Sequence, residues 1–97
     1  MGKLNWTSES QQWLKDIYEY IEADNPRAAQ SVVLGIYDSA QVLLDNPEIG
    51  YSYQSSSRQV RILMYGHYRI AYLAKESGNI DILGVFHGAL DISRYSL

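Results

Sequence analysis

The sequence predicts an α+β fold in which a short strand, two helices and an antiparallel sheet follow one another. Three observations predict it. Apolar residues recur with the helical period through the first half, the period changes to two in the second half, and turn residues separate the segments. With 97 residues, the chain is expected to form one domain spanning residues 1–97.

The first segments are a short strand and a helix. "LNWT" is the strand candidate, and Ser8 with Gln11 gives the spacing of a capping box that begins the helix. Apolar side chains then recur at i, i+3, i+4 and i+7, which predicts one buried stripe over two turns, formed by Leu14, Ile17, Tyr18 and Ile21.

The second helix has the clearest boundaries. Asn25 is a favoured N-cap, and Pro26 suits the first helical position. The helical period then holds from Ala29 to Leu44, and the residue before Pro47 is biased away from helical conformation. The short link between the two helices predicts an antiparallel helical hairpin.

The second half predicts a polar loop followed by a sheet. "IGYSYQSSSR" is the expected loop, and "RQVRILMY", "HYRIAYLAK" and "NIDILGVFH" are the expected strands of an antiparallel meander. With "LNWT" as a possible fourth member, the sheet has three to four antiparallel strands, in the order β-α-α-β-β-β with a short C-terminal tail. No internal repeat interrupts this order.

The turn between the first two of these strands fixes which residues share a face. Gly66-His67 suits a two-residue hairpin, which sets Tyr65 opposite Tyr68 and Met64 opposite Arg69. Because side chains alternate, one face is then expected to carry Val60, Ile62, Met64, Arg69, Ala71 and Leu73. Arg61 lies on the other face among tyrosines, where it could stack on aromatic rings.

Composition excludes several classes of protein. The chain is 46% hydrophobic and 20% charged, as in ordinary globular proteins, and no apolar run approaches the roughly 20 residues of a membrane span. The N-terminus shows no signal peptide. Without cysteine there is no disulfide or thiolate nucleophile, and His67 and His87, far apart in the sequence, predict no metal site. We expect a cytoplasmic protein without membrane partner, metal or cofactor.

The charge is unevenly distributed. Residues 1–50 hold three basic and eight acidic side chains, a net charge of −5, whereas residues 51–97 hold five basic and three acidic ones, a net charge of +2. The overall charge of −3 argues against direct DNA binding. Four of the five later cations are arginines, which suit phosphate or carboxylate contacts but are also ordinary solvated charges.

The segments and their order resemble the RelE/ParE superfamily of bacterial type II toxins over essentially the whole chain. The resemblance rests on the Asn25-Pro26 helix start, the "NPEIG" stop, the "YRIAY" strand and the "VFHGA" strand end, taken together in this spacing. It implies a toxin that is neutralised by a cognate antitoxin encoded beside it, in a pair that helps to keep plasmids or chromosomal segments.

The superfamily implies two possible mechanisms. RelE-like members cut messenger RNA on the ribosome without a metal, whereas ParE-like members inhibit DNA gyrase by binding. RNA cleavage needs cations at the scissile phosphate and acid–base groups beside it. Two lysine positions of the nuclease branch align with Val60 and Ile62 here, and an arginine position aligns with Ala89. This loss favours the ParE-like branch, and the chain is then not an enzyme.

The alternatives define the candidate site residues. If the chain is a ribosome-dependent endoribonuclease, the resemblance gives Arg69, His87 and Tyr95 as catalytic candidates. Arg69 could instead pair structurally, and His87 could simply close its strand. Arg61 and Arg94 are the candidates for binding a partner protein.

A third possibility is a degenerate member that binds an antitoxin but is not toxic. In every case, the antitoxin is expected to be a partly disordered, basic chain that docks on the acidic helical half.

Overall fold

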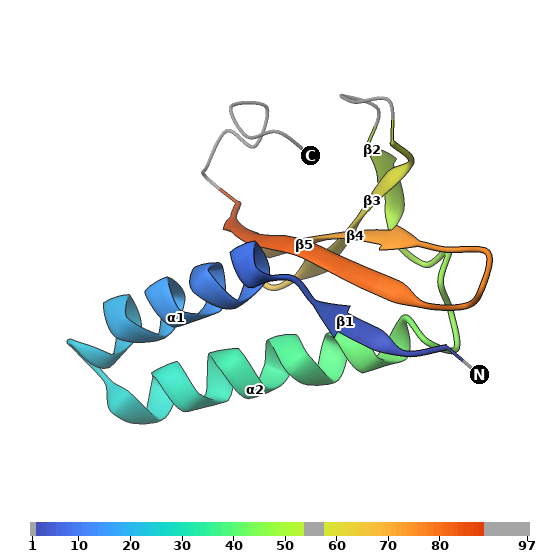
Figure 1. Cartoon of the computed structure of the whole chain (residues 1–97). Coiled ribbons are helices and arrows are strands. Elements are labelled where there is room, and N and C mark those ends of the chain that lie inside the picture. Colours follow the sequence, from blue (N-terminus) through green and yellow to red (C-terminus); the bar gives the residue numbers. More distant parts are fainter. Residues whose placement is uncertain (1, 54–57, 89–97) are drawn as a thin grey trace.

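The computed structural model describes residues 2–53 and 58–88. The elements in chain order are β1 (Leu4–Trp6), α1 (Ser8–Glu22), α2 (Pro26–Val42), β2 (Tyr51–Tyr53), β3 (Val60–Tyr65), β4 (Tyr68–Ala74) and β5 (Ile80–His87). Figure 1 shows the two helices side by side on one side of the sheet. The predicted α+β class and the helical hairpin are confirmed.

The helix starts are set by side chains that accept backbone N–H groups. In α2, the Asn25 side chain accepts a hydrogen bond from the Ala28 N–H and Pro26 follows, as predicted. In α1, the N-cap is Thr7 and not Ser8, because the Thr7 hydroxyl accepts from the Ser10 N–H. The same hydroxyl donates to the Ile82 carbonyl at 2.7 Å, so tertiary contact with β5 selects the cap.

The sheet has five strands in the order β1-β5-β4-β3-β2, one more than the upper limit predicted. The β3–β4 register sets Tyr65 opposite Tyr68 and Met64 opposite Arg69, which confirms the two-residue turn and the assignment of faces. Gly66 in that turn has φ of 55°, a left-handed conformation that glycine adopts without strain.

Two features of the sheet were not predicted. β1 pairs with β5 in parallel, so the sheet is mixed and not antiparallel throughout. β2 lies in the segment expected to be a loop, and it pairs with β3 so that Tyr51 opposes Ile62 and Tyr53 opposes Val60. Both strands are three residues long, and each depends on a neighbour for its backbone hydrogen bonds.

The core is divided between the two faces of the sheet. The larger cluster lies between sheet and helices and includes Leu14, Ile36, Leu43, Ile70 and Tyr72. A smaller cluster on the opposite face comprises Val60, Ile62, Ala71 and Phe86.

Trp13 of α1 contacts both clusters and meets the Phe86 ring edge-on at 4.7 Å. A methyl group on Gly84 would lie 2.7 Å from the Phe86 ring, so glycine at this position leaves room for that ring to fold over β5.

No helix among the described residues is both long and apolar enough to cross a membrane.

Candidate functional site

Two of the three positions where the nuclease branch was expected to carry cations, Val60 and Ile62, belong to the smaller cluster, and the third, Ala89, lies outside the described residues. Val60 and Ile62, which align with lysines of that branch, are each 1% exposed in this structure. Their burial confirms that the sheet is packed at these two positions. Among the described side chains that β3 and β4 place on the face of this cluster, Arg69 is the one cation.

Arg69 and His87 do not share a face. The β4–β5 register pairs Arg69 with Phe86 and Tyr68 with His87, so the two candidate side chains leave the sheet in opposite directions. The Arg69 Nη2 donates to the Gly88 carbonyl at 2.9 Å, which fixes the guanidinium to the end of β5. The third catalytic candidate, Tyr95, lies outside the described residues, as does the binding candidate Arg94.

His87 lies on the helix side, at the end of β5. Its ring meets the Tyr68 ring edge-on at 5.6 Å and is stacked on the His67 ring at 6.3 Å. The hairpin turn thus brings together two histidines that are distant in the sequence. No group of three or more histidine, aspartate or glutamate side chains in residues 2–53 and 58–88 is placed to hold a metal ion.

Arg61 binds a loop of its own chain. Its Nη1 donates to the Gly50 carbonyl at 2.7 Å and to the Glu48 carbonyl at 3.3 Å. The buried Tyr72 hydroxyl contacts the same loop, because it donates to the Pro47 carbonyl and accepts from the Gly50 N–H. The guanidinium therefore has a structural role in holding the "NPEIG" segment to the sheet.

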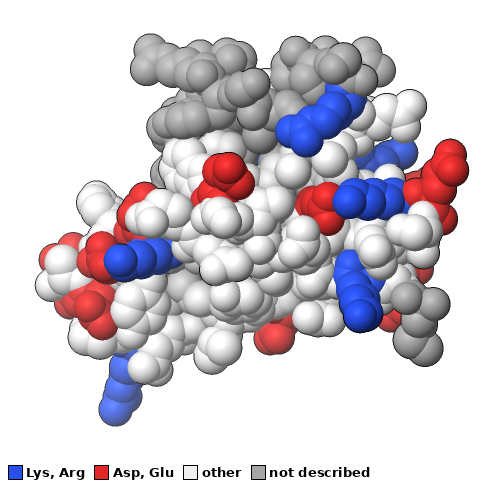
Figure 2. Space-filling model, viewed as in Figure 1, with Lys and Arg blue, Asp and Glu red and all other residues white. Residues whose placement is uncertain are grey.

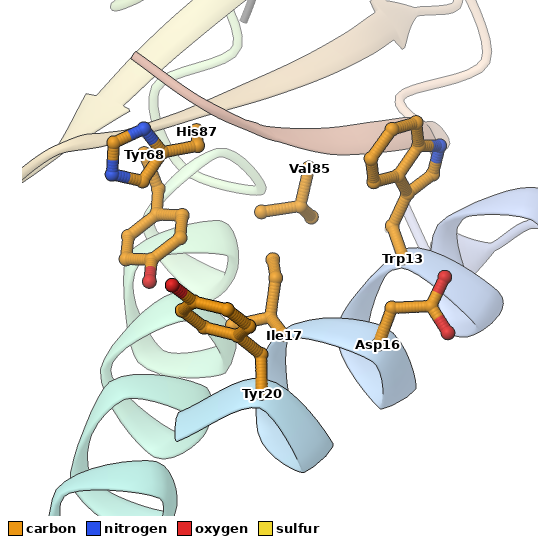
Figure 3. A pocket seen from close by; sticks show the side chains of 7 residues that line it. All are labelled: Trp13, Asp16, Ile17, Tyr20, Tyr68, Val85 and His87. Atoms are coloured by element: carbon orange, nitrogen blue, oxygen red, sulfur yellow. The ribbon is translucent and has the colours of Figure 1, made fainter. Parts of the chain in front are cut away.

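A groove lies between α1, the start of β4 and the end of β5, close to His87. It has a volume of about 400 Å³. Helix α1 lines it with Trp13, Asp16, Ile17 and Tyr20, and the sheet lines it with Tyr68, Val85 and His87. Figure 3 shows Tyr20 and Tyr68 pointing toward each other across one end, with Ile17 and Val85 at the centre and Trp13 and Asp16 at the other end.

The groove is apolar with an acidic border. Burial raises the pKa of the Tyr68 phenol, and the nearby Tyr20 raises it further. The Tyr68 and Tyr20 rings together form an aromatic wall at this end of the groove. Asp16 is the carboxylate of the lining and accepts a hydrogen bond from the Gln12 side chain at 2.9 Å. Such a surface suits an apolar side chain accompanied by a cation.

The groove itself was not predicted, although two of its residues were: His87 as a catalytic candidate, and Asp16 as part of the acidic helical half expected to receive the antitoxin. Ile17 was predicted to belong to the core stripe of α1, and Trp13 and Tyr20 were not predicted as site residues. The signal that could have found them is a second stripe on α1, since Trp13, Ile17 and Tyr20 are spaced i, i+4 and i+7. Tyr20 is 83% exposed, which is unusual for a large aromatic side chain.

The strand order β1-β5-β4-β3-β2 and the helical hairpin on one face define a small α+β fold with a mixed sheet. A search against models of protein families matched residues 4–92 to the ParE toxin of type II toxin-antitoxin system, parDE. The chain therefore belongs to this family, as its sequence segments indicated.

Comparison with solved structures supports the same fold. The chain is similar to a structure described as the chromosomal ParDE TA system from P. aeruginosa, with a TM-score of 0.75 and 23% identity. The alignment covers 90% of this chain and 96% of that one. A search of curated protein sequences found no match.

Proposed function

We propose that this chain is a toxin that stops bacterial growth by binding DNA gyrase in the cytoplasm, and that a cognate antitoxin neutralises it. Membership of the ParE family supports the toxin class. The observation that carries the choice of mechanism is the burial of Val60 and Ile62, since these positions cannot present cations to a phosphate.

The placement of the remaining candidates supports the same choice. A nuclease needs its acid–base group and its phosphate-binding cation on one surface, within hydrogen-bond reach of the scissile phosphate. Arg69 and His87 leave opposite faces of the sheet, and Arg69 already donates to a backbone carbonyl. Inhibition by binding needs neither group to act chemically. We further propose that the toxin and its antitoxin together stabilise the replicon that carries their genes, whether that replicon is a plasmid or a chromosomal segment.

The test is to induce the chain in growing bacteria, follow growth, and map the 5′ ends of an abundant transcript. We expect growth arrest without codon-phased cuts inside reading frames. Such cuts would contradict the proposal and establish the endoribonuclease alternative, and the variants Arg69→Ala and His87→Ala would then be expected to abolish them. Normal growth at full expression would instead indicate a member that has lost toxicity.

A further inference from the structure

We propose that His67 and His87 together form a binding site for a transition-metal ion of the zinc class, with two imidazole ligands from the protein and water at the remaining positions. The two histidines are far apart along the chain, which predicted no metal site, but the fold sets the centres of their rings 6.3 Å apart. The inference goes beyond the proposed function and does not depend on which target the toxin binds.

The backbone holds the two histidines beside each other. The β4–β5 register places Tyr68, the residue after His67, opposite His87. The Gly88 N–H, next along the chain from His87, donates a hydrogen bond to the His67 carbonyl. Because these contacts already fix the main chain at both positions, an ion that binds both side chains orders little further backbone.

The two rings lie near the separation that a chelated ion requires. Their planes are inclined by 23°. Two imidazoles on one zinc ion have ring centres roughly 5 Å apart, because each coordinating nitrogen lies about 2.0–2.1 Å from the metal. The rings must therefore approach each other by about 1 Å, and rotation about the side-chain bonds of two exposed residues supplies this movement.

The charge of the surroundings favours a cation at this site. Asp16 lines the same groove as His87, and the whole chain carries a net charge of −3. Figure 2 shows acidic side chains gathered over the end of the helical hairpin where α1 gives way to α2. The β4–β5 register pairs Arg69 with Phe86, so the Arg69 side chain leaves the sheet on the face opposite to His87.

The chemistry of the ligands selects the metal. Neutral imidazole suits zinc, copper and nickel, whereas magnesium and calcium prefer oxygen ligands. Within residues 2–53 and 58–88, no acidic side chain joins the pair in a group of three that could hold an ion, so this part of the chain supplies two ligands. Two linked ligands bind more tightly than one, because the second contact is intramolecular once the first has formed.

The test is a calorimetric titration of the full, untagged chain with zinc chloride, repeated with magnesium chloride. The variants are His67→Ala and His87→Ala, each of which leaves one imidazole at the site. Both histidines are exposed, so both variants are expected to fold. Asp16→Asn is the matched control, because Asp16 lines the same groove but is not a proposed ligand.

We expect the unaltered chain to bind one zinc ion, and each histidine variant to bind zinc roughly a hundredfold more weakly, since the second contact is lost. Asp16→Asn should stay within about threefold of the unaltered chain, as for a screened surface charge. Magnesium should give no heat of binding. In NMR spectra of the unaltered chain, zinc should shift the imidazole signals of His67 and His87 together, a result that does not depend on the folding of any variant.

Unchanged zinc affinity in either histidine variant would overturn the inference, because one imidazole would then be sufficient. Equal binding of zinc and magnesium would also overturn it, since carboxylates and not imidazoles would then hold the ion. Absence of zinc binding by the unaltered chain, or a zinc titration that leaves both imidazole signals in place, would contradict it directly. None of these outcomes affects growth arrest or the inhibition of gyrase, so the proposed function is tested separately.

Discussion

Asp81 shows how a single carboxylate joins three segments of this fold. The Lys75 ammonium lies 2.8 Å from its Oδ2, and the Asn5 side chain donates to Oδ1 at 3.2 Å. The hydrogen bond from Lys75 lowers the pKa of Asp81 most, with Asn5 and the charge of Lys75 adding to it against the opposing effect of burial. The carboxylate thereby fixes β1 and the β4–β5 turn to the start of β5.

Replacing Asp81 with asparagine tests this role. We expect Asp81→Asn to lower the free energy of unfolding by about 0.5 kcal/mol at pH 7, as for a partly exposed ion pair. Because the folded-state pKa lies below that of the unfolded chain, the contribution is complete above about pH 4 and disappears as the pH falls through the folded-state value. Urea denaturation of both proteins at pH 7 and in strong acid measures it. A difference that did not change with pH would contradict the assignment, and Asp38→Asn is the control.

Single residues also show where sequence reasoning reaches its limit. The alternation of side chains predicted that Arg69 shares a face with Val60 and Ile62, and the register confirms it. The same reasoning placed Arg61 among aromatic rings, but its guanidinium binds backbone carbonyls of a loop that is distant in the sequence. Hydrogen bonds of this kind depend on where the loop packs, and the pattern of neighbouring residues does not predict that position.

At the scale of elements, the predictions succeeded where the stabilising pattern is local. The α2 cap, the hairpin turn and the strand period are properties of a few neighbouring residues, and all three were predicted. β2 and the parallel pairing of β1 were not, because three-residue strands exist only through their neighbours in the sheet. The loop before β2 also depends on residues of the sheet, because the side chains of Tyr72 and Arg61 donate hydrogen bonds to its backbone carbonyls.

The attachment of this loop can be tested through Tyr72. The hydroxyl is fully buried, donates to the Pro47 carbonyl at 2.8 Å and accepts from the Gly50 N–H at 3.0 Å. Tyr72→Phe leaves both backbone groups without this partner, so we expect a loss of about 1–3 kcal/mol in the free energy of unfolding. Hydrogen exchange of the Gly50 amide should accelerate. Unchanged exchange would contradict the role, and Tyr37→Phe on the surface of α2 should have little effect on either quantity.

At the scale of the whole molecule, the two faces of the sheet have separate roles. The helix-covered face holds the main core, and the opposite face is packed by a smaller cluster, which consists of Val60, Ile62, Ala71 and Phe86. The alternation of apolar side chains was sufficient to predict that Val60 and Ile62 are buried on this opposite face. It was not sufficient to predict the groove, which forms only where the outer stripe of α1 meets the ends of β4 and β5.

The central claim is inhibition by binding, and a supercoiling assay with purified DNA gyrase and the purified chain tests it most directly. The account predicts that the chain inhibits supercoiling in proportion to its concentration and that prior addition of the antitoxin restores activity. It also predicts that Arg69→Ala and His87→Ala, if folded, inhibit as the unaltered chain does. Full gyrase activity at saturating toxin, together with cleavage of messenger RNA on purified ribosomes, would contradict the account.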